Sequence, residues 1–193
     1  VDFKILLLTF AEIFSSKGIY DRKVWIYFIV KEKLEELIRI SELHNDSYYI
    51  IDLENLANDL KLFKKAFCDL DYIISYSYKT NYLKSIIQFL DRNEIKSELV
   101  SPFEIEISKN YNINPASIIY NGPLKDKQSI SYVLEGKGII HADSLDDLIL
   151  INDVVKNSKK PIYDSKIGVR LSIKDDKLIS RFGIEYDKKN FKD

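Results

Sequence analysis

From Tyr48 onward the chain repeats a short apolar segment followed by an amphipathic one, and this rhythm constrains the fold more than any other feature. The apolar segments are rich in β-branched and aromatic residues, which predicts strands, whereas the amphipathic segments carry apolar residues at helical spacing. Predicted strands cover residues 48–53, 72–78, 98–100, 117–120, 138–141 and 166–173. Predicted helices cover residues 54–67, 82–90, 102–110, 126–135 and 145–155. This alternation predicts an α/β fold with a parallel sheet and right-handed crossovers, either a (β/α)8 barrel or a doubly wound open sheet.

Local signals support these boundaries. Asp52, Ser101 and Ser144 each stand directly before or at a predicted helix start, where a side-chain oxygen can accept from the free N–H groups of the first turn. The predicted strands are continuously apolar, which is typical of a sheet buried on both faces. No Gly-x-Gly-x-x-Gly follows the first strand and the chain has only 6 glycines, which weakens a dinucleotide-binding version of the fold.

Composition and charge exclude several classes of protein. The net charge is −1 and acidic residues are interleaved with the lysines, so no basic face for nucleic acid is expected. No apolar run approaches the roughly 20 residues that a membrane-spanning helix needs. A single cysteine, Cys68, rules out an intrachain disulfide, and only two histidines argue against a metal centre. We expect the Cys68 thiol to be buried. The absence of disulfides suits a reducing cytoplasm.

The first 47 residues do not follow the strand–helix rhythm. They contain apolar stretches at 4–14 and 24–30 and an amphipathic pattern at 31–43. We therefore expect two parts, an N-terminal extension over residues 1–47 and a partial barrel domain over residues 48–193. The apolar content of the extension predicts that it packs on the barrel or on a partner subunit.

Candidate functional residues lie where ligands bind in any such array, at the carboxyl ends of the strands. These residues are Lys79, Glu98 with Ser101, Asn121, Asp143 and Arg170. Lys79 ends an aromatic strand, and partial burial there would favour the neutral, nucleophilic amine that forms a Schiff base with an aldehyde cofactor. A surface lysine at a strand end is the competing interpretation.

A family resemblance favours the interpretation of Lys79 as a Schiff-base lysine. The segment Tyr76-Ser77-Tyr78-Lys79-Thr80-Asn81 resembles the Tyr-Ala-Val-Lys-Ala-Asn signature of the diaminopimelate/ornithine decarboxylase family. Six further blocks resemble this family in the same order and at similar spacing, over residues 48–53, 98–104, 113–125, 143–148, 168–171 and 180–183.

The resemblance implies a pyridoxal 5'-phosphate-binding (β/α)8 barrel in which Lys79 holds the cofactor as a Schiff base. Glu98 stands where the family has an Asp near the cofactor ring, and Arg170 where the family has an Arg near the ring hydroxyl. Ser77, Tyr78 and Thr80 depart from the signature. Because side chains alternate along a strand, we expect Tyr78 to point away from Lys79 and pack against a helix.

The activity implied is that of a carboxy-lyase, a decarboxylase of a basic amino acid or a diaminopimelate-like substrate. The family completes its site across a dimer, which implies a homodimer. Racemase-type and cofactor-carrier proteins of the same fold have different lysine motifs. A non-catalytic protein that binds pyridoxal phosphate, or only keeps the fold for a regulatory role, stays as the alternative. For His141, at the end of the fifth predicted strand, we expect no chemistry.

The strand count predicts an incomplete barrel, because a closed one needs eight strands and six are predicted over residues 48–173. We expect either further sequence or another chain to complete it. The 193 residues alone should bind the cofactor poorly and show no decarboxylation.

Overall fold

The computed structural model describes residues 33–39, 42, 50–158, 162, 164–173 and 182–186. Contacts divide the chain into two compact units, Val1–Ile51 and Asp52–Asp193. In the first unit residues 33–39 are helical, within the amphipathic segment 31–43. The segments 4–14 and 24–30 lie outside the described residues, so an N-terminal extension over residues 1–47 stays a prediction.

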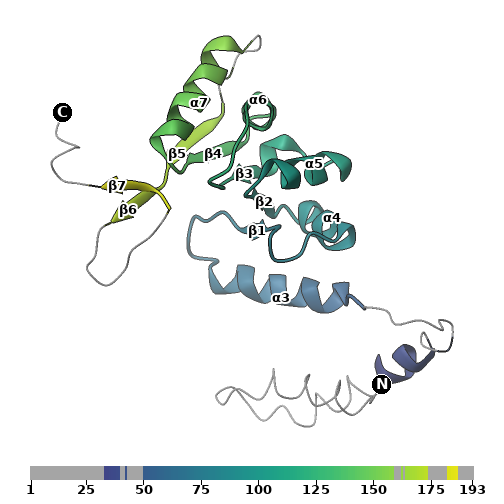
Figure 1. Cartoon of the computed structure of the whole chain (residues 1–193). Coiled ribbons are helices and arrows are strands. Elements are labelled where there is room, and N and C mark those ends of the chain that lie inside the picture. The colour runs from purple at the N-terminus through teal and green to yellow at the C-terminus, as the bar shows by residue number, and fades with distance from the viewer. Residues whose placement is uncertain are drawn as a thin grey trace. The chain divides into compact units, whose positions relative to one another are not determined.

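The second unit contains a five-stranded parallel sheet (Figure 1). Its strands are β1 (Ser75–Ser77), β2 (Lys96–Leu99), β3 (Ile118–Tyr120), β4 (Ile139–Ala142) and β5 (Lys166–Val169). They lie in sequence order, β1-β2-β3-β4-β5, with no reversal. Right-handed crossovers that all step in one direction place every helix on the same face, whereas a doubly wound sheet reverses and is covered on both. The order therefore confirms the barrel-type α/β fold, present in part, and excludes the open-sheet alternative.

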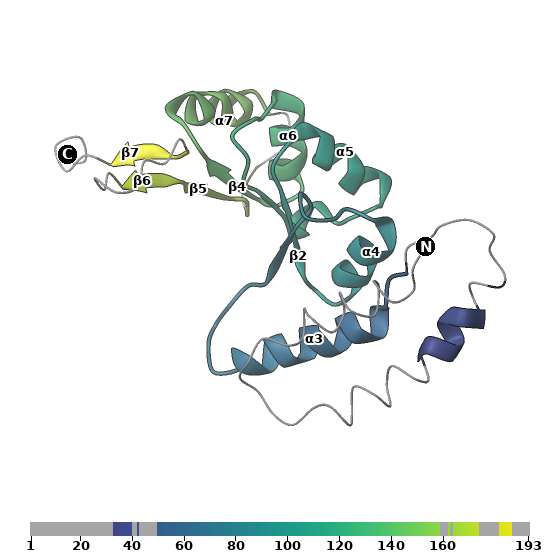
Figure 2. The same ribbon diagram turned by 60° about the horizontal axis from the view of Figure 1, so that its bottom comes forward.

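The helices are α3 (Leu53–Ala66), α4 (Lys84–Arg92), α5 (Pro102–Asn110), α6 (Lys127–Glu135) and α7 (Leu145–Asn157). Helices α4 to α7 run along one face of the sheet (Figures 1 and 2). The three predicted caps are confirmed, because Asp52, Ser101 and Ser144 accept from the backbone N–H three residues on. Asp126 caps α6 in the same way. Each cap satisfies a backbone donor that the helix cannot pair internally.

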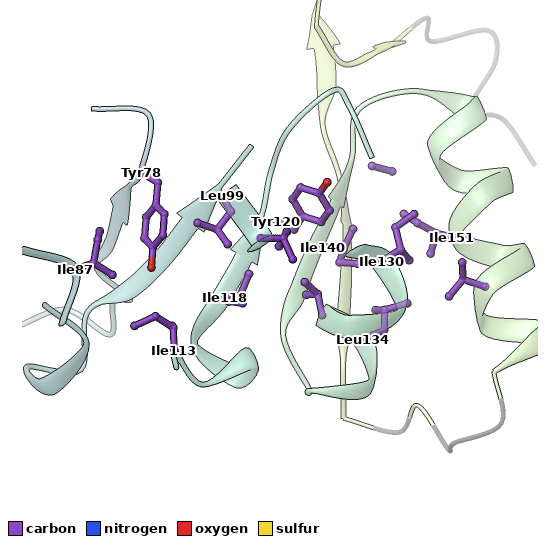
Figure 3. Close-up of a cluster of buried hydrophobic side chains, with 14 residues drawn as sticks. Tyr78, Ile87, Leu99, Ile113, Ile118, Tyr120, Ile130, Leu134, Ile140 and Ile151 are labelled. Carbon is purple, nitrogen blue, oxygen red and sulfur yellow. The ribbon is translucent and has the colours of Figure 1, made fainter. Parts of the chain in front are cut away.

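The core fills the space between the sheet and these helices. Alternate residues of β2, β3 and β4 point into it, among them Leu99, Tyr120 and Ile140, each with no exposed surface (Figure 3). Tyr78 joins this cluster and shares a hydrogen bond of 3.2 Å with the hydroxyl of Ser97. The prediction that Tyr78 packs against the helices is thus confirmed.

The edge at β5 is different. Ile167 pairs with Ile140 and Val169 with Ala142, so both belong to the helix-covered face by register. Yet Ile167 is 47% exposed and Val169 45% exposed, because no described helix covers them. An apolar, uncovered edge strand agrees with a barrel of which only part is present.

Two predicted strands differ from the structure. Residues 50–52 form no strand, because Asp52 is used as the cap of α3, which begins at Leu53; residues 48 and 49 lie outside the described part. The segment 166–173 divides into β5 and β6 (Leu171–Ile173) at Arg170, where the chain changes neighbour. The Arg170 N–H donates to Ala142 of β4, whereas its carbonyl accepts from Ile184 of β7, a strand that the sequence did not predict.

The short strand β7 (Ile184–Tyr186) pairs in parallel with β6 as a separate two-stranded sheet (Figure 1). Gly183 enters it with φ +91°, a conformation that favours glycine. The expected burial of Cys68 is wrong, because this thiol is exposed in the turn after α3. Within the described segments, no helix is both long and apolar enough to cross a bilayer.

Candidate active site

The open face of the sheet, opposite the helices, collects polar side chains at the carboxyl ends of the strands. The register places Glu98, His141 and Gly168 on this face, since their neighbours Leu99, Ile140 and Val169 belong to the other. The polar groups that follow the strand ends or lie at them are Lys79, Glu98, Asn121, His141, Asp143 and Arg170. In barrels of parallel strands this edge is where ligands bind.

Lys79 stands in a tight turn that continues β1. The N–H and the hydroxyl of Thr80 both donate to the carbonyl of Ser77, at 3.2 and 2.7 Å. Asn81 accepts from the N–H of Leu83 at 3.0 Å and so fixes the approach to α4. The hydrogen bonds of Thr80 and Asn81 therefore fix the backbone conformation on both sides of Lys79. The Lys79 side chain itself is exposed, so the partial burial expected from the sequence is absent in this sheet.

Carboxylates lie near this lysine. Asn121 donates to Glu98 across the strand ends at 3.4 Å, which steadies the longer side chain found where the family has Asp. Glu104, in the first turn of α5, is buried and accepts from the N–H of Val100 at 2.7 Å. Burial raises the pKa of Glu104, the neighbouring Glu98 charge raises it further, and Lys79 lowers it. Lys79, Glu98 and Glu104 thus share one electrostatic environment.

Arg170 follows β5 at the same edge. Its guanidinium Nη1 lies 3.0 Å from Asp143 Oδ1, and the group lies over the Phe182 ring at 4.8 Å from the centroid. Glu98 and Arg170 therefore have different partners, Asn121 and Asp143.

His141 lies beside Gly168 in the register. A Cβ added at Gly168 would come within 2.4 Å of the imidazole Cδ2, so the glycine makes room for the ring. The structure therefore places His141 on the polar face with the candidate residues. The expectation that His141 has no chemical role stays a prediction.

These groups fit a cofactor with an aldehyde and several acceptor oxygens. Among the buried side-chain atoms of the described residues, the Ser77 hydroxyl is the one without a hydrogen-bond partner, and Ser77 pairs with Glu98 in the register. A buried hydroxyl without a partner carries a cost that a ligand atom can remove. The described residues contain no group of three or more side chains suited to a metal ion.

Fold and site together define a class: a parallel-barrel segment with a lysine at the carboxyl edge, suited to carry an aldehyde cofactor. The family comparison agrees. Residues 53–191 match the pyridoxal-binding domain of the pyridoxal-dependent decarboxylases, which is more than half of the chain. The chain belongs to this family, and the cofactor of the matching domain is pyridoxal phosphate, as the sequence predicted.

Individual proteins are similar to this chain in sequence or in fold. Diaminopimelate decarboxylase of Methanocaldococcus jannaschii is 27% identical over 128 residues, which are 63% of this chain and 29% of the relative. A crystal structure of that archaeon's diaminopimelate decarboxylase superposes with a TM-score of 0.66 at 22% identity, over 77% of this chain and 37% of the other. A lysine/ornithine decarboxylase from Vibrio vulnificus, solved with cadaverine, gives 0.59 at 17% identity, over 73% and 36%. The chain thus spans about a third of the length of these relatives.

Sequence reasoning missed the buried contacts behind this face. Glu104 and Asp147 fall within the family blocks 98–104 and 143–148, but their hydrogen bonds to the N–H groups of Val100 and Asp143 were not predicted. A Ser-x-x-acid spacing after β2 and after β4 was the available signal, since the capping box uses that spacing.

Proposed function

We propose that this chain supplies the pyridoxal-phosphate-binding part of the active site of an amino-acid decarboxylase, with Lys79 as the residue that holds the cofactor covalently. The observation that carries the proposal is the rigid turn of Lys79 at the carboxyl edge of a parallel sheet, beside Glu98 and the unpartnered Ser77 hydroxyl. The membership of the pyridoxal-dependent decarboxylase family supports it.

Each residue has a distinct task in this proposal. Lys79 offers its amine to the cofactor aldehyde and, on release, can hold a proton near the reacting carbon. Glu98, steadied by Asn121, presents a carboxylate to the cofactor ring, and Arg170 presents N–H donors to an anionic oxygen. When bound, pyridoxal phosphate supplies an electron sink for the electron pair left behind as the substrate loses CO2.

The substrate class is a basic amino acid or a diaminopimelate-like compound, and the working assembly is a homodimer. Support for the substrate class comes from the relatives, which are a diaminopimelate decarboxylase and a lysine/ornithine decarboxylase, the latter solved with cadaverine. The homodimer rests on the family resemblance alone. A diaminopimelate decarboxylase from Helicobacter pylori was solved with L-lysine. This chain spans about a third of the length of such proteins, and the open face described above does not distinguish among these substrates.

The direct test is to trap the link between protein and cofactor. The complete homodimeric protein, and not the 193 residues alone, is incubated with pyridoxal phosphate, reduced with borohydride and digested, and the labelled peptide is mapped. The label is expected on Lys79. The matched control is Lys166→Ala, which removes an exposed lysine at the opposite, amino end of β5 and should leave labelling unchanged.

Three outcomes are distinguishable. A label on Lys79 together with CO2 release from lysine, ornithine or diaminopimelate supports the whole proposal. A label on Lys79 without CO2 release from any amino acid favours the non-catalytic alternative. A label on another lysine, or none at saturating cofactor, sinks the assignment of Lys79.

A further inference from the structure

Lys125 is a buried cation that the proposed chemistry does not use. It follows β3, and its side chain has no exposed surface. Its ammonium lies 2.7 Å from Asp147 Oδ2, donates to the carbonyl of Gly122, and lies 5.6 Å from the centroid of the Tyr120 ring. Burying such a pair costs several kcal/mol of desolvation per ion, which close geometry and extra hydrogen bonds only offset. A buried ion pair is therefore weak evidence of stabilisation, and a positioning role is the alternative to examine.

The Asp147 carboxylate is shared between two elements. The same Oδ2 atom that meets Lys125 also accepts from the N–H of Asp143 at 2.9 Å. The N–H of Asp147 in turn donates to the Ser144 hydroxyl at 3.1 Å, which fixes the first turn of α7. Asp147 thus ties the loop after β3, through Lys125, to the residue that directly follows β4.

That residue carries the partner of Arg170. Arg170 Nη1 lies 3.0 Å from Asp143 Oδ1. Contacts therefore run without a break from Lys125 through Asp147 and Asp143 to Arg170. The line begins in the buried layer and ends on the open face, at a guanidinium that is 41% exposed in its side chain. A flexible, exposed arginine loses rotamer freedom when it binds a ligand, and prior fixation of its partner reduces that cost.

The same pattern of a serine cap and an acid that accepts from the preceding backbone N–H follows β2, but there it lacks a buried lysine. Glu104 accepts from the Val100 N–H at 2.7 Å and its own N–H donates to the Ser101 hydroxyl at 3.3 Å. Burial raises the pKa of Glu104, and the Lys79 charge lowers it without forming a direct ion pair with this carboxylate among the described residues. The buried cation Lys125 therefore distinguishes the cap after β4 from the cap after β2. The cap after β4 is also the one that includes Asp143, the partner of Arg170.

We propose that Asp147, held by Lys125, is a positioning residue that aligns Arg170 for the cofactor through the backbone and carboxylate of Asp143. This inference rests on the proposed function, because Arg170 is there assigned to the cofactor. Asp147 touches neither cofactor nor substrate in this arrangement and acts only through Asp143.

The test compares two double variants that differ in a single contact. In K125M/D147N both charges are gone and the amide oxygen can still accept from the Asp143 N–H. In K125M/D147L that acceptor is replaced by an apolar side chain of similar size. Removing both charges avoids an uncompensated buried ion, so both variants should fold with similar unfolding midpoints.

Two readouts separate this inference from the proposed function. The first uses cofactor-free protein: ¹⁵N relaxation of the Arg170 Nε–H signal, assigned by its loss in R170Q, should show greater mobility in K125M/D147L than in K125M/D147N. The second is the Kd for pyridoxal phosphate by absorbance titration. K125M/D147N should stay near wild type and K125M/D147L should bind about three- to tenfold more weakly, as for the loss of one hydrogen bond. In an R170Q background that difference should vanish.

Equal Arg170 mobility in the two double variants at equal stability would overturn the positioning role. So would an affinity difference that persists in R170Q, because the effect would then bypass the arginine. Failure of the complete wild-type protein to bind the cofactor, with the mobility difference present, would contradict the proposed function alone. If K125M/D147L does not fold, D147E replaces it: the ion pair is kept, the longer side chain shifts the oxygen from the Asp143 N–H, and unchanged Arg170 mobility would again overturn the proposal.

Discussion

The two faces of the sheet are built from the same strands, yet their side chains differ in kind. Toward the helices, Leu99, Ile118, Tyr120 and Ile140 are fully enclosed in one apolar cluster (Figure 3). Toward the open side, the strand ends carry carboxylates, an amide, an imidazole and a guanidinium. The period of two along a strand separates the sets residue by residue.

The difference shows how one sheet divides stability from chemistry. The covered face removes apolar surface from water, which is the dominant favourable contribution to folding. The open face keeps polar groups in reach of a ligand and contributes little burial. Substitutions on one face should therefore affect stability, and substitutions on the other should affect binding and turnover.

The largest effect is expected for Lys79→Ala on the open face. Loss of the amine removes the covalent attachment of the cofactor, so turnover of the complete homodimeric protein should fall at least about a thousandfold. The urea unfolding midpoint should stay at the wild-type value, because Lys79 is exposed. Decarboxylation is followed by CO2 release, with Lys166→Ala as the control. Substantial turnover in Lys79→Ala would contradict the assignment of the chemistry to the open face and to Lys79.

Leu99→Ala tests the covered face. This side chain has no exposed surface, so truncation should lower the free energy of unfolding by about 2–5 kcal/mol through lost burial and the cavity left behind. Ile119→Ala is the matched change on the open face of the adjacent strand, where the side chain is only partly buried, and it should cost clearly less. Denaturant unfolding measures both. Equal losses would show that the open face is covered as tightly as the helix-facing one.

Asp126→Ala tests the cap of α6, one of the helices that cover the sheet. Asp126 accepts from the Ser129 N–H at 2.7 Å at the start of α6. Loss of this cap should lower the free energy of unfolding by about 1 kcal/mol. Asp126→Asn keeps an acceptor and should remain close to wild type. A loss as large for Asn as for Ala would assign the effect to the charge instead of the hydrogen bond.

The last prediction concerns alkaline pH, outside the range in which the other variants are compared. Burial raises the pKa of Tyr78 from 10.0 to about 12, and it raises the pKa of the buried Tyr120 as well. The unfolded phenol ionises first, so the stability due to the neutral buried phenol is present below pH 10 and is lost as pH rises toward 12. Tyr78→Phe should therefore show a shallower loss between pH 10 and 12. Unfolding midpoints across that range measure the slope, and an unchanged slope would show that Tyr78 is not a contributor.

Helix starts were the features most accurately predicted from the sequence. Ser101 and Ser144 cap α5 and α7 at the predicted positions, because a cap depends on contacts within one turn. Tyr78 likewise follows from strand alternation alone. The segment 166–173 was predicted as one strand, because nothing local shows that Arg170 leaves β4 and pairs onward with β7. Strand boundaries of this kind depend on partners far away in the sequence.

The candidate site divides in the same way. Lys79, Glu98 and Arg170 were recognised from their positions at strand ends and from the family blocks, and their roles toward the cofactor stay predictions. The line from Lys125 through Asp147 and Asp143 to Arg170 could not be read from the sequence, since its first and last members are 45 positions apart (170 − 125).

By itself, the sequence determined the alternation of strands and helices, the capped helix starts and the lysine signature, because each depends on side chains a few positions apart. Only the tertiary structure decided the order of the strands, the face on which each side chain lies and the partner of each buried charge. The physical reason is that hydrogen-bond pairing between strands and desolvation of ionic groups depend on which distant segments meet, and that is set by packing of the whole unit.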